Sequence, residues 1–69
     1  IILPGQYTFG TVDKEVMEIL AGTLNVQLPG TLVFTAYPAG QTFTVPAHSE
    51  FTVSTDTVCD YYCAYLPEA

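Results

Sequence analysis

Three side chains in this sequence are suited to acid–base chemistry near neutral pH. His48 is the only histidine, and it stands two residues before Glu50. Histidine is the side chain that most readily exchanges a proton near neutral pH. Glu15 lies in a largely apolar stretch, where an unpartnered buried carboxylate would be costly. Glu15, His48 and Glu50 are therefore candidate catalytic residues, and the alternative is that His48 and Glu50 belong to an ordinary surface turn.

Aromatic side chains form a second group of candidate functional residues, suited to binding a ligand. Tyr and Phe rings offer faces on which a flat ligand ring can stack without strong discrimination. The alternative is that most of these aromatics only fill the core or a subunit interface. The candidates for ligand binding are Tyr7, Phe9, Phe43, Phe51, Tyr62 and Tyr65, with Tyr61 beside them.

Metal and disulfide chemistry are not expected. One histidine and scattered carboxylates do not make a ligand set for a transition metal, so we predict no metal and no cofactor. Cys59 and Cys63 are the only cysteines. On one strand their Cα atoms would lie roughly 13 Å apart, whereas a disulfide needs less than about 7 Å. Two reduced thiols are typical of a cytoplasmic protein.

The charge balance excludes several partners. The formal net charge is −6, Lys14 is the only basic side chain, and arginine is absent. Binding to nucleic acid or to an anionic membrane requires several basic residues, so neither is expected. No apolar run approaches the roughly 20 residues of a membrane span, and Ile1 to Leu3 is too short for the apolar part of a signal peptide.

The elements that must position these residues are predicted to be short strands. Alternating apolar and polar residues and Pro or Gly turn signals predict about seven of them. The expected strands are Gln6–Thr11, Glu15–Ala21, Thr23–Leu28, Thr31–Tyr37, two strands within Gly40–Val53, and Thr57–Leu66. A short helix over Glu15–Ala21, capped by Asp13, is the alternative for the second segment. Pro46 to Ser49 is predicted to be a corner, because Pro46 lacks the N–H group of a continuing ladder.

These strands predict one small all-β domain over residues 1–69. Strands at this spacing are typical of a small barrel or sandwich. A chain of this length buries only about 60% of its unfolded surface, so a partner subunit is the expected further source of stability. The sequence enters directly into an apolar stretch, as if it were a fragment that lacks its beginning.

Two fragments resemble the cupin superfamily of small jelly-roll type β-barrels. Glu15, six residues and then Gly22 is similar to the second half of the first cupin motif. Gly40, five residues and then Pro46 is similar to the start of the second motif. Metal-binding cupins place histidine ligands at positions that fall within Thr8–Thr11 and at Phe51 here, and no ligand stands there.

A closer resemblance links most of the chain to the pyrimidine/purine nucleoside phosphorylase family of small cupins. It is carried by Gly5–Phe9, Met17–Pro29, Ala39–Phe51 and Tyr62–Leu66. It implies a homodimeric enzyme that converts a nucleoside and phosphate into a free base and ribose 1-phosphate, and the absent ligands predict that this enzyme is metal-independent. It also implies that purines and pyrimidines are both accepted, and that one or two N-terminal strands are missing from this sequence.

The chain departs from the family pattern where phosphate would bind. Family members often carry Arg in the last strand where this chain has Ala64, and only Lys14 remains as a fixed cation. Backbone N–H groups at Gly40 or at the 47–49 turn could donate to phosphate. A non-catalytic small-cupin module that binds a small molecule or forms a structural dimer is therefore the alternative function.

Overall fold

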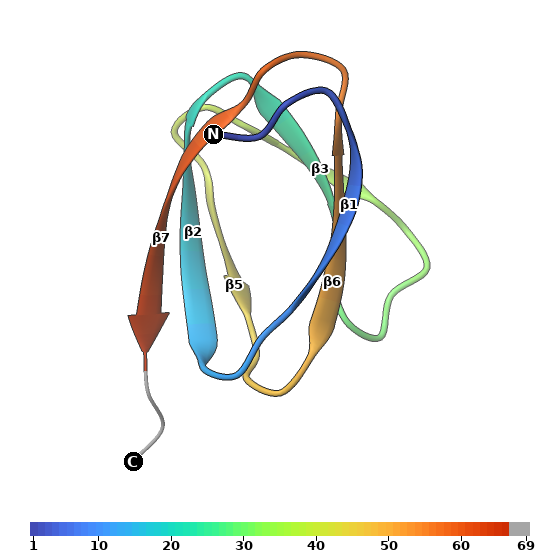
Figure 1. Cartoon of the computed structure of the whole chain (residues 1–69), viewed down its shortest axis with the longest axis vertical. Helices are drawn as coiled ribbons and strands as arrows, with labels where there is room; N and C mark the ends of the chain where they lie inside the picture. Colours follow the sequence, from blue (N-terminus) through green and yellow to red (C-terminus); the bar gives the residue numbers. More distant parts are fainter. Residues whose placement is uncertain (67–69) are drawn as a thin grey trace.

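Seven antiparallel strands form two sheets in the computed structural model, which describes residues 1–66 (Figure 1). The strands are β1 (Gly5–Gly10), β2 (Lys14–Ala21), β3 (Thr23–Gln27), β4 (Thr35–Pro38), β5 (Thr42–Val45), β6 (Glu50–Thr55) and β7 (Asp60–Leu66). The described residues form no helix, and so none that is long and apolar enough to cross a membrane. The prediction of an all-β fold is confirmed, and the helix over Glu15–Ala21 is replaced by β2.

The strands divide into a first sheet with the order β1-β6-β3-β4 and a second sheet with the order β5-β2-β7. No strand of one sheet pairs with a strand of the other, so residues 1–66 form a two-sheet sandwich without closing into a barrel. Edge strands β1 and β7 therefore border one side of the sandwich, where Figure 1 shows them separated below the N-terminal segment. This side of the molecule contains the candidate site.

Backbone hydrogen bonds outside the strand ladders are few. On the side of β4 and β5, the Gly40 amide donates to the Ile19 carbonyl at 2.8 Å, which extends the β2–β5 pairing into the turn that follows β4. On the side of β1 and β7, Ile2 and Cys59 exchange both backbone hydrogen bonds, at 2.7 and 2.9 Å. The β1–β7 side is thus bridged at one end.

The core lies between the sheets and follows the predicted alternation. Met17 and Ile19 of β2 face inward, whereas Glu18 and Leu20 face solvent. The same period of two buries every second side chain of β3, β5 and β6, because successive side chains of a strand point to opposite faces. The fully buried side chains are Ile19, Leu24, Val26, Val45, Val53 and Cys59.

The predicted strand over Thr31–Tyr37 is wrong in its first half. Thr31 instead closes a turn, because its amide and its hydroxyl both donate to the Leu28 carbonyl, at 3.2 and 3.0 Å. Leu32 is 94% exposed, and β4 begins only at Thr35. The β-branched and aromatic composition favoured a strand, but the local turn bonds after Pro29 and Gly30 compete with the sheet ladder.

The corner over Pro46–Ser49 carries the chain from β5 in the second sheet to β6 in the first. Buried Thr11 holds it in place: its hydroxyl donates to the Pro46 carbonyl at 2.7 Å and accepts from the Ser49 amide at 3.0 Å. His48 adopts a φ of 54°, a left-handed conformation that non-glycine residues seldom adopt. The predicted corner is confirmed, and Pro46 lies just beyond the last residue of β5.

Gly22 lies at another of the crossings between the sheets, the one from β2 to β3. Its φ is +80°, and a Cβ atom built at this position would lie 2.8 Å from the Val58 carbonyl oxygen. Glycine is therefore required twice over, by the backbone conformation and by the close approach of a neighbouring main chain.

Candidate functional site

A cavity of about 150 Å³ lies between the two sheets near the edge strands β1 and β7. We call it the inner cavity. One wall comes from β2 and β7, and the other from β1 and β6. Its lining consists of Ile2, Phe9, Gly10, Glu15, Met17, Phe51, Tyr61, Cys63 and Tyr65.

The polar wall is built by the cross-strand register of β2 and β7. Glu15 pairs with Tyr65 and Met17 pairs with Cys63, so these four side chains share the inner face of the second sheet. Opposed residues of an antiparallel pair have Cβ atoms about 4.5–5.5 Å apart. A carboxylate, a thiol and a phenol are therefore gathered at one end of the cavity, and Met17 and Tyr61 continue the wall as an apolar surface.

Glu15 and Cys63 are in direct contact. The Cys63 Sγ–H donates to Glu15 Oε1 over 3.6 Å. Burial raises the pKa of the Cys63 thiol, and the neighbouring Glu15 carboxylate adds to this effect. The negative charges that Cys63 and Glu15 carry when ionised likewise raise the pKa of Tyr65. At neutral pH, Cys63 and Tyr65 are thus uncharged hydrogen-bond donors beside an acceptor.

The opposite wall is aromatic. Phe9 of β1 pairs with Phe51 of β6, and their ring centroids lie 5.7 Å apart with the planes tilted by 44°. Phe51 is buried at 3% exposure, whereas Phe9 is 41% exposed and presents its ring to the opening. Behind them, Phe43 packs against Phe51 and against Tyr37, with the Tyr37 centroid 4.8 Å away.

A wider apolar depression continues from the inner cavity toward the N-terminal segment. It has a volume of about 360 Å³, and it shares Ile2, Phe9 and Tyr61 with the inner cavity. We call it the outer groove. Its other lining residues are Ile1, Leu3 and Tyr7. The Tyr7 hydroxyl donates to the Leu3 carbonyl at 3.1 Å, which fixes the Tyr7 ring against this segment.

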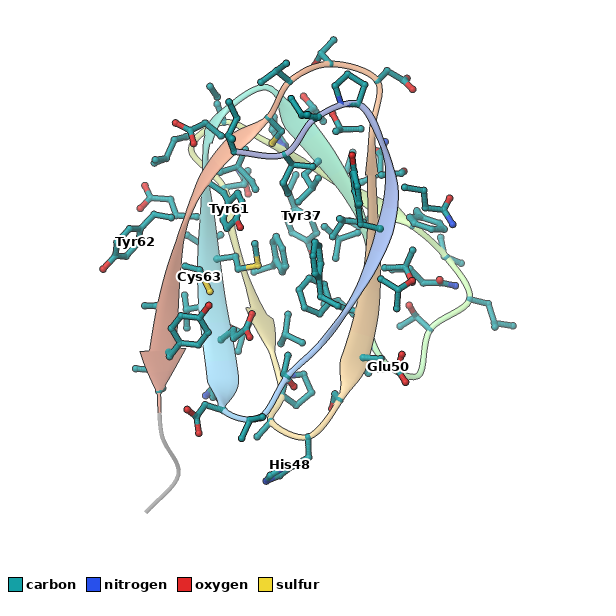
Figure 2. The ribbon with its side chains drawn as sticks, in the orientation of Figure 1. Tyr37, His48, Glu50, Tyr61, Tyr62 and Cys63 are labelled. Carbon is teal, nitrogen blue, oxygen red and sulfur yellow. The ribbon has the colours of Figure 1, made fainter. Side chains whose placement is uncertain are left out.

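The structure brings some of the candidate residues together. Glu15, Phe9, Phe51 and Tyr65 all line the inner cavity, and Tyr7 lines the outer groove. Figure 2 shows Tyr61 and Cys63 on the inner side of β7, facing the space between the sheets.

Other candidates lie elsewhere. Tyr62 is 60% exposed and projects from the outer face of β7, because it is one residue out of phase with Tyr61 and Cys63. His48 points away from the molecule at the corner, and Glu50 is exposed at the start of β6 (Figure 2). Phe43 is a core residue that supports the Phe51 ring.

Two residues with clear roles are not evident from the sequence. From the sequence, Cys63 is interpreted as a small reduced thiol without a role in the site. The alternation of the strand nevertheless places it on the same face as Tyr61 and Tyr65. No local sequence pattern marks Thr11 as important, because its hydrogen bonds join it to a corner more than 30 residues away in the sequence.

The electrostatic character of the site is acidic. Neither the inner cavity nor the outer groove is lined by Lys, Arg or His, and Lys14 is exposed at the start of β2. Within residues 1–66, no group of three or more His, Cys, Asp or Glu side chains could hold a metal ion. The arrangement is suited to hold a flat, uncharged ring that offers an N–H group to Glu15.

The fold and the cavity define a small two-sheet all-β protein with an acidic, aromatic-lined interior site. The family model for pyrimidine/purine nucleoside phosphorylases matches residues 1–65. The chain belongs to this family, and the resemblance seen in its sequence motifs is confirmed.

Several relatives carry the same family name. The pyrimidine/purine nucleoside phosphorylase of Clostridioides difficile (strain 630) is 46% identical over 68 residues, covering 99% of this chain and 65% of the relative. The one from Leptospira interrogans (strain Fiocruz L1-130) is 50% identical over 66 residues, covering 96% of this chain and 62% of the relative. The chain thus spans just under two thirds of the length of these relatives.

Solved structures of similar proteins share the fold. A protein of unknown function from Vibrio parahaemolyticus superposes with a TM-score of 0.91 at 38% sequence identity, covering 94% of this chain and 69% of that one. A second protein of unknown function, from Acinetobacter sp. ADP1, gives a TM-score of 0.92 at 39% identity, covering 94% and 64%.

Proposed function

We propose that this chain is, or is the core of, a broad-specificity nucleoside phosphorylase that converts a nucleoside and phosphate into the free base and ribose 1-phosphate. The observation that carries this proposal is the family match over residues 1–65, which includes every residue that lines the inner cavity. We further propose that the enzyme needs no metal or cofactor besides phosphate as co-substrate, and that it acts in the cytoplasm.

The reaction assigns distinct tasks to the residues of the site. A phosphate oxygen forms a bond to ribose C1′ while the bond from C1′ to the base nitrogen breaks, and its electron pair and a proton go to the base. We assign Glu15 and Tyr65 to hydrogen bonds with the base, and Phe9 and Phe51 to stacking against it.

The other candidates are assigned to the edge of the site. Glu50 pairs with Gly10 of the cavity wall, so the corner with Glu50 and His48 borders the end of the cavity near Glu15. We assign these two side chains to the base end of the ligand beside Glu15, because the outer groove receives the sugar. Tyr7 is assigned to the sugar in the outer groove, and Phe43 and Tyr62 remain candidates for support of the bound ligand.

A cupin fold of the jelly-roll type and a homodimer belong to the same proposal. The spacing of Glu15 to Gly22 and of Gly40 to Pro46 supports the cupin assignment, since Gly22 and Gly40 both have positive φ at the ends of strands. Strands β1, β4, β5 and β7 are edges within residues 1–66, and edge strands favour pairing with a second subunit.

A non-catalytic binding module is the second candidate function. It is favoured by the acidic site, because a phosphate dianion needs cationic or N–H donors and would be repelled by Glu15. Such a module would bind a base in the inner cavity without binding phosphate.

The test is release of uracil and adenine from uridine and adenosine, followed by chromatography with and without phosphate. We expect base release that rises with phosphate concentration and saturates, together with formation of ribose 1-phosphate in equal amount. Base release that is absent at saturating phosphate would remove the enzyme function. Calorimetry then identifies the module if free base binds and phosphate does not.

A further inference from the structure

We propose that the inner cavity binds the base of the nucleoside and prefers bases of the uracil type. These are pyrimidines in which an N3–H group is flanked by two carbonyls. This inference rests on the proposed function for the nature of the ligand, and it ranks uracil-type bases first within a broad substrate range. The sugar then extends into the outer groove.

The size of the inner cavity fits one six-membered ring. Its volume is about 150 Å³, and an apolar protein cavity of about this volume holds one benzene molecule. Phe9 and Phe51 on one wall face Tyr61 and Met17 on the other. A single flat ring is therefore held between an aromatic face and a mixed apolar face, whereas a purine must extend beyond the cavity.

The polar end of the inner cavity matches one edge of the uracil ring. Glu15 is an acceptor, and two donors adjoin it: Cys63, which contacts it over 3.6 Å, and Tyr65, which lies opposite it in the strand register. Uracil and thymine present the reverse set, a ring N–H donor between two carbonyl acceptors. Cytosine and adenine instead place a ring nitrogen acceptor beside an amino donor, which would direct an acceptor at the Glu15 carboxylate.

The Glu15 carboxylate can accept a further hydrogen bond from such a ligand. Within residues 1–66, the one hydrogen bond to its carboxylate comes from the Cys63 thiol, which is a weak donor. A ring N–H is a stronger donor, so a bound uracil improves the hydrogen bonding of a half-buried charge. A site built around such a bond rejects an analogue that lacks the N–H group far more strongly than a site built on shape alone.

The outer groove gives the ring substituent a way out. It shares Ile2, Phe9 and Tyr61 with the inner cavity, so a ring substituent that points away from Glu15 enters it directly. In uridine the sugar is on N1, which is separated from N3 by one carbon, so the bond to the sugar leaves a different side of the ring from the N3–H bond. Placing N3–H on Glu15 therefore directs the sugar toward the groove and solvent.

Two isomeric probes test the inference independently of catalysis. 1-Methyluracil keeps the N3–H and mimics the glycosidic bond, whereas 3-methyluracil has the same composition and lacks the N3–H. Calorimetry is expected to show 1-methyluracil binding at least tenfold more tightly than 3-methyluracil or 9-methyladenine. Bound 1-methyluracil should also slow alkylation of Cys63, measured by mass spectrometry of the labelled peptide.

Substitutions connect the preference to the side chains. Glu15→Leu removes the acceptor and should abolish the difference between the two methyluracils. Glu18→Leu changes the same residue type on the exposed face of β2 and should preserve it. If Glu15→Leu fails to fold, Tyr65→Phe removes the neighbouring donor instead and should weaken 1-methyluracil binding at least threefold.

The outcomes separate this inference from the proposed function. Equal binding of the two methyluracils, or binding that leaves the Cys63 alkylation rate unchanged, overturns the assignment of the inner cavity even if the chain catalyses phosphorolysis. A clear preference for 1-methyluracil without phosphorolysis supports the base site and removes the enzyme function.

Discussion

Glu15 lies directly opposite Tyr65 in the register of β2 and β7, and both side chains line the inner cavity. This pairing places a carboxylate at the opening between the two sheets while keeping it next to a hydroxyl group. The identity of the residue at position 15 therefore controls the polarity of the whole site.

Glu15→Gln is expected to lower kcat/KM for uridine at least tenfold, because it replaces the charged acceptor by a neutral amide that also donates. Glu18→Gln is the matched control on the outer face of the same strand and should retain the rate of the unchanged chain. His48→Asn keeps a residue that tolerates positive φ, and its effect should stay below threefold. Steady-state phosphorolysis measures all three, and a loss at His48 larger than that at Glu15 would move the chemistry to the corner.

The raised pKa of the Cys63 thiol predicts that the folded chain loses stability in alkaline solution. Its pKa in the folded chain is raised above its ordinary value of 9.0, so the folded state binds this proton more tightly than the unfolded state does. The resulting stability is complete below about pH 9.0 and is lost as pH rises through the folded pKa.

Urea unfolding at pH 7 and at pH 10 measures this effect. We expect the free energy of unfolding of Cys63→Ala to fall less between the two values than that of the unchanged chain. Cys59 also has a raised pKa, so a smaller alkaline loss remains in the variant, whereas the raised pKa of Tyr65 is caused mainly by Cys63 and falls when Cys63 is removed. Equal losses in both proteins would show that Cys63 does not contribute.

Thr11→Val is expected to destabilise the fold by about 1–3 kcal/mol, because it leaves the Ser49 amide and the Pro46 carbonyl without their partner in a partly buried corner. Thr8→Val removes an exposed hydrogen bond of 3.0 Å between the hydroxyl groups of Thr8 and Thr52. It should lower the free energy of unfolding by less than about 0.5 kcal/mol. Chemical denaturation of both variants gives the comparison. Equal costs would contradict the role of Thr11 in holding the corner.

Gly22→Ala is expected to cost about 3 kcal/mol, since a strained positive φ and a main-chain clash add together. Gly40 has a φ of +93°, but a Cβ atom added there would meet no atom within 4 Å, so Gly40→Ala should cost only about 1–2 kcal/mol. Thermal unfolding monitored by circular dichroism orders the two variants. A larger shift for Gly40→Ala would contradict the close approach at Val58.

Most of the strands are predictable from the sequence because alternation is a local signal. The strands expected over Glu15–Ala21 and Thr23–Leu28, for example, correspond to β2 and β3 within one residue at each end. The exception, Thr31–Phe34, shows the limit of that signal: residues with high strand propensity remain in a loop when a turn satisfies their backbone groups locally.

The candidate site is less completely predictable because it depends on register. Alternation places Tyr61, Cys63 and Tyr65 on one face, but it cannot show that Glu15 lies opposite Tyr65. The titratable ring of His48 makes it prominent in the sequence, yet its side chain points away from the molecule (Figure 2). Pairing between distant strands, set by the whole fold, decides both outcomes.

The two walls of the inner cavity also determine when the site can form. β1 pairs with β6, whose residues lie about 40–50 positions later in the sequence, and β2 pairs with β7 at a similar separation. Closing such long loops costs entropy before any pairing energy is gained, so folds of this kind assemble slowly. A ligand that binds the inner cavity therefore recognises only chains in which both of these late pairings are complete, and it acts as a reporter of finished folding.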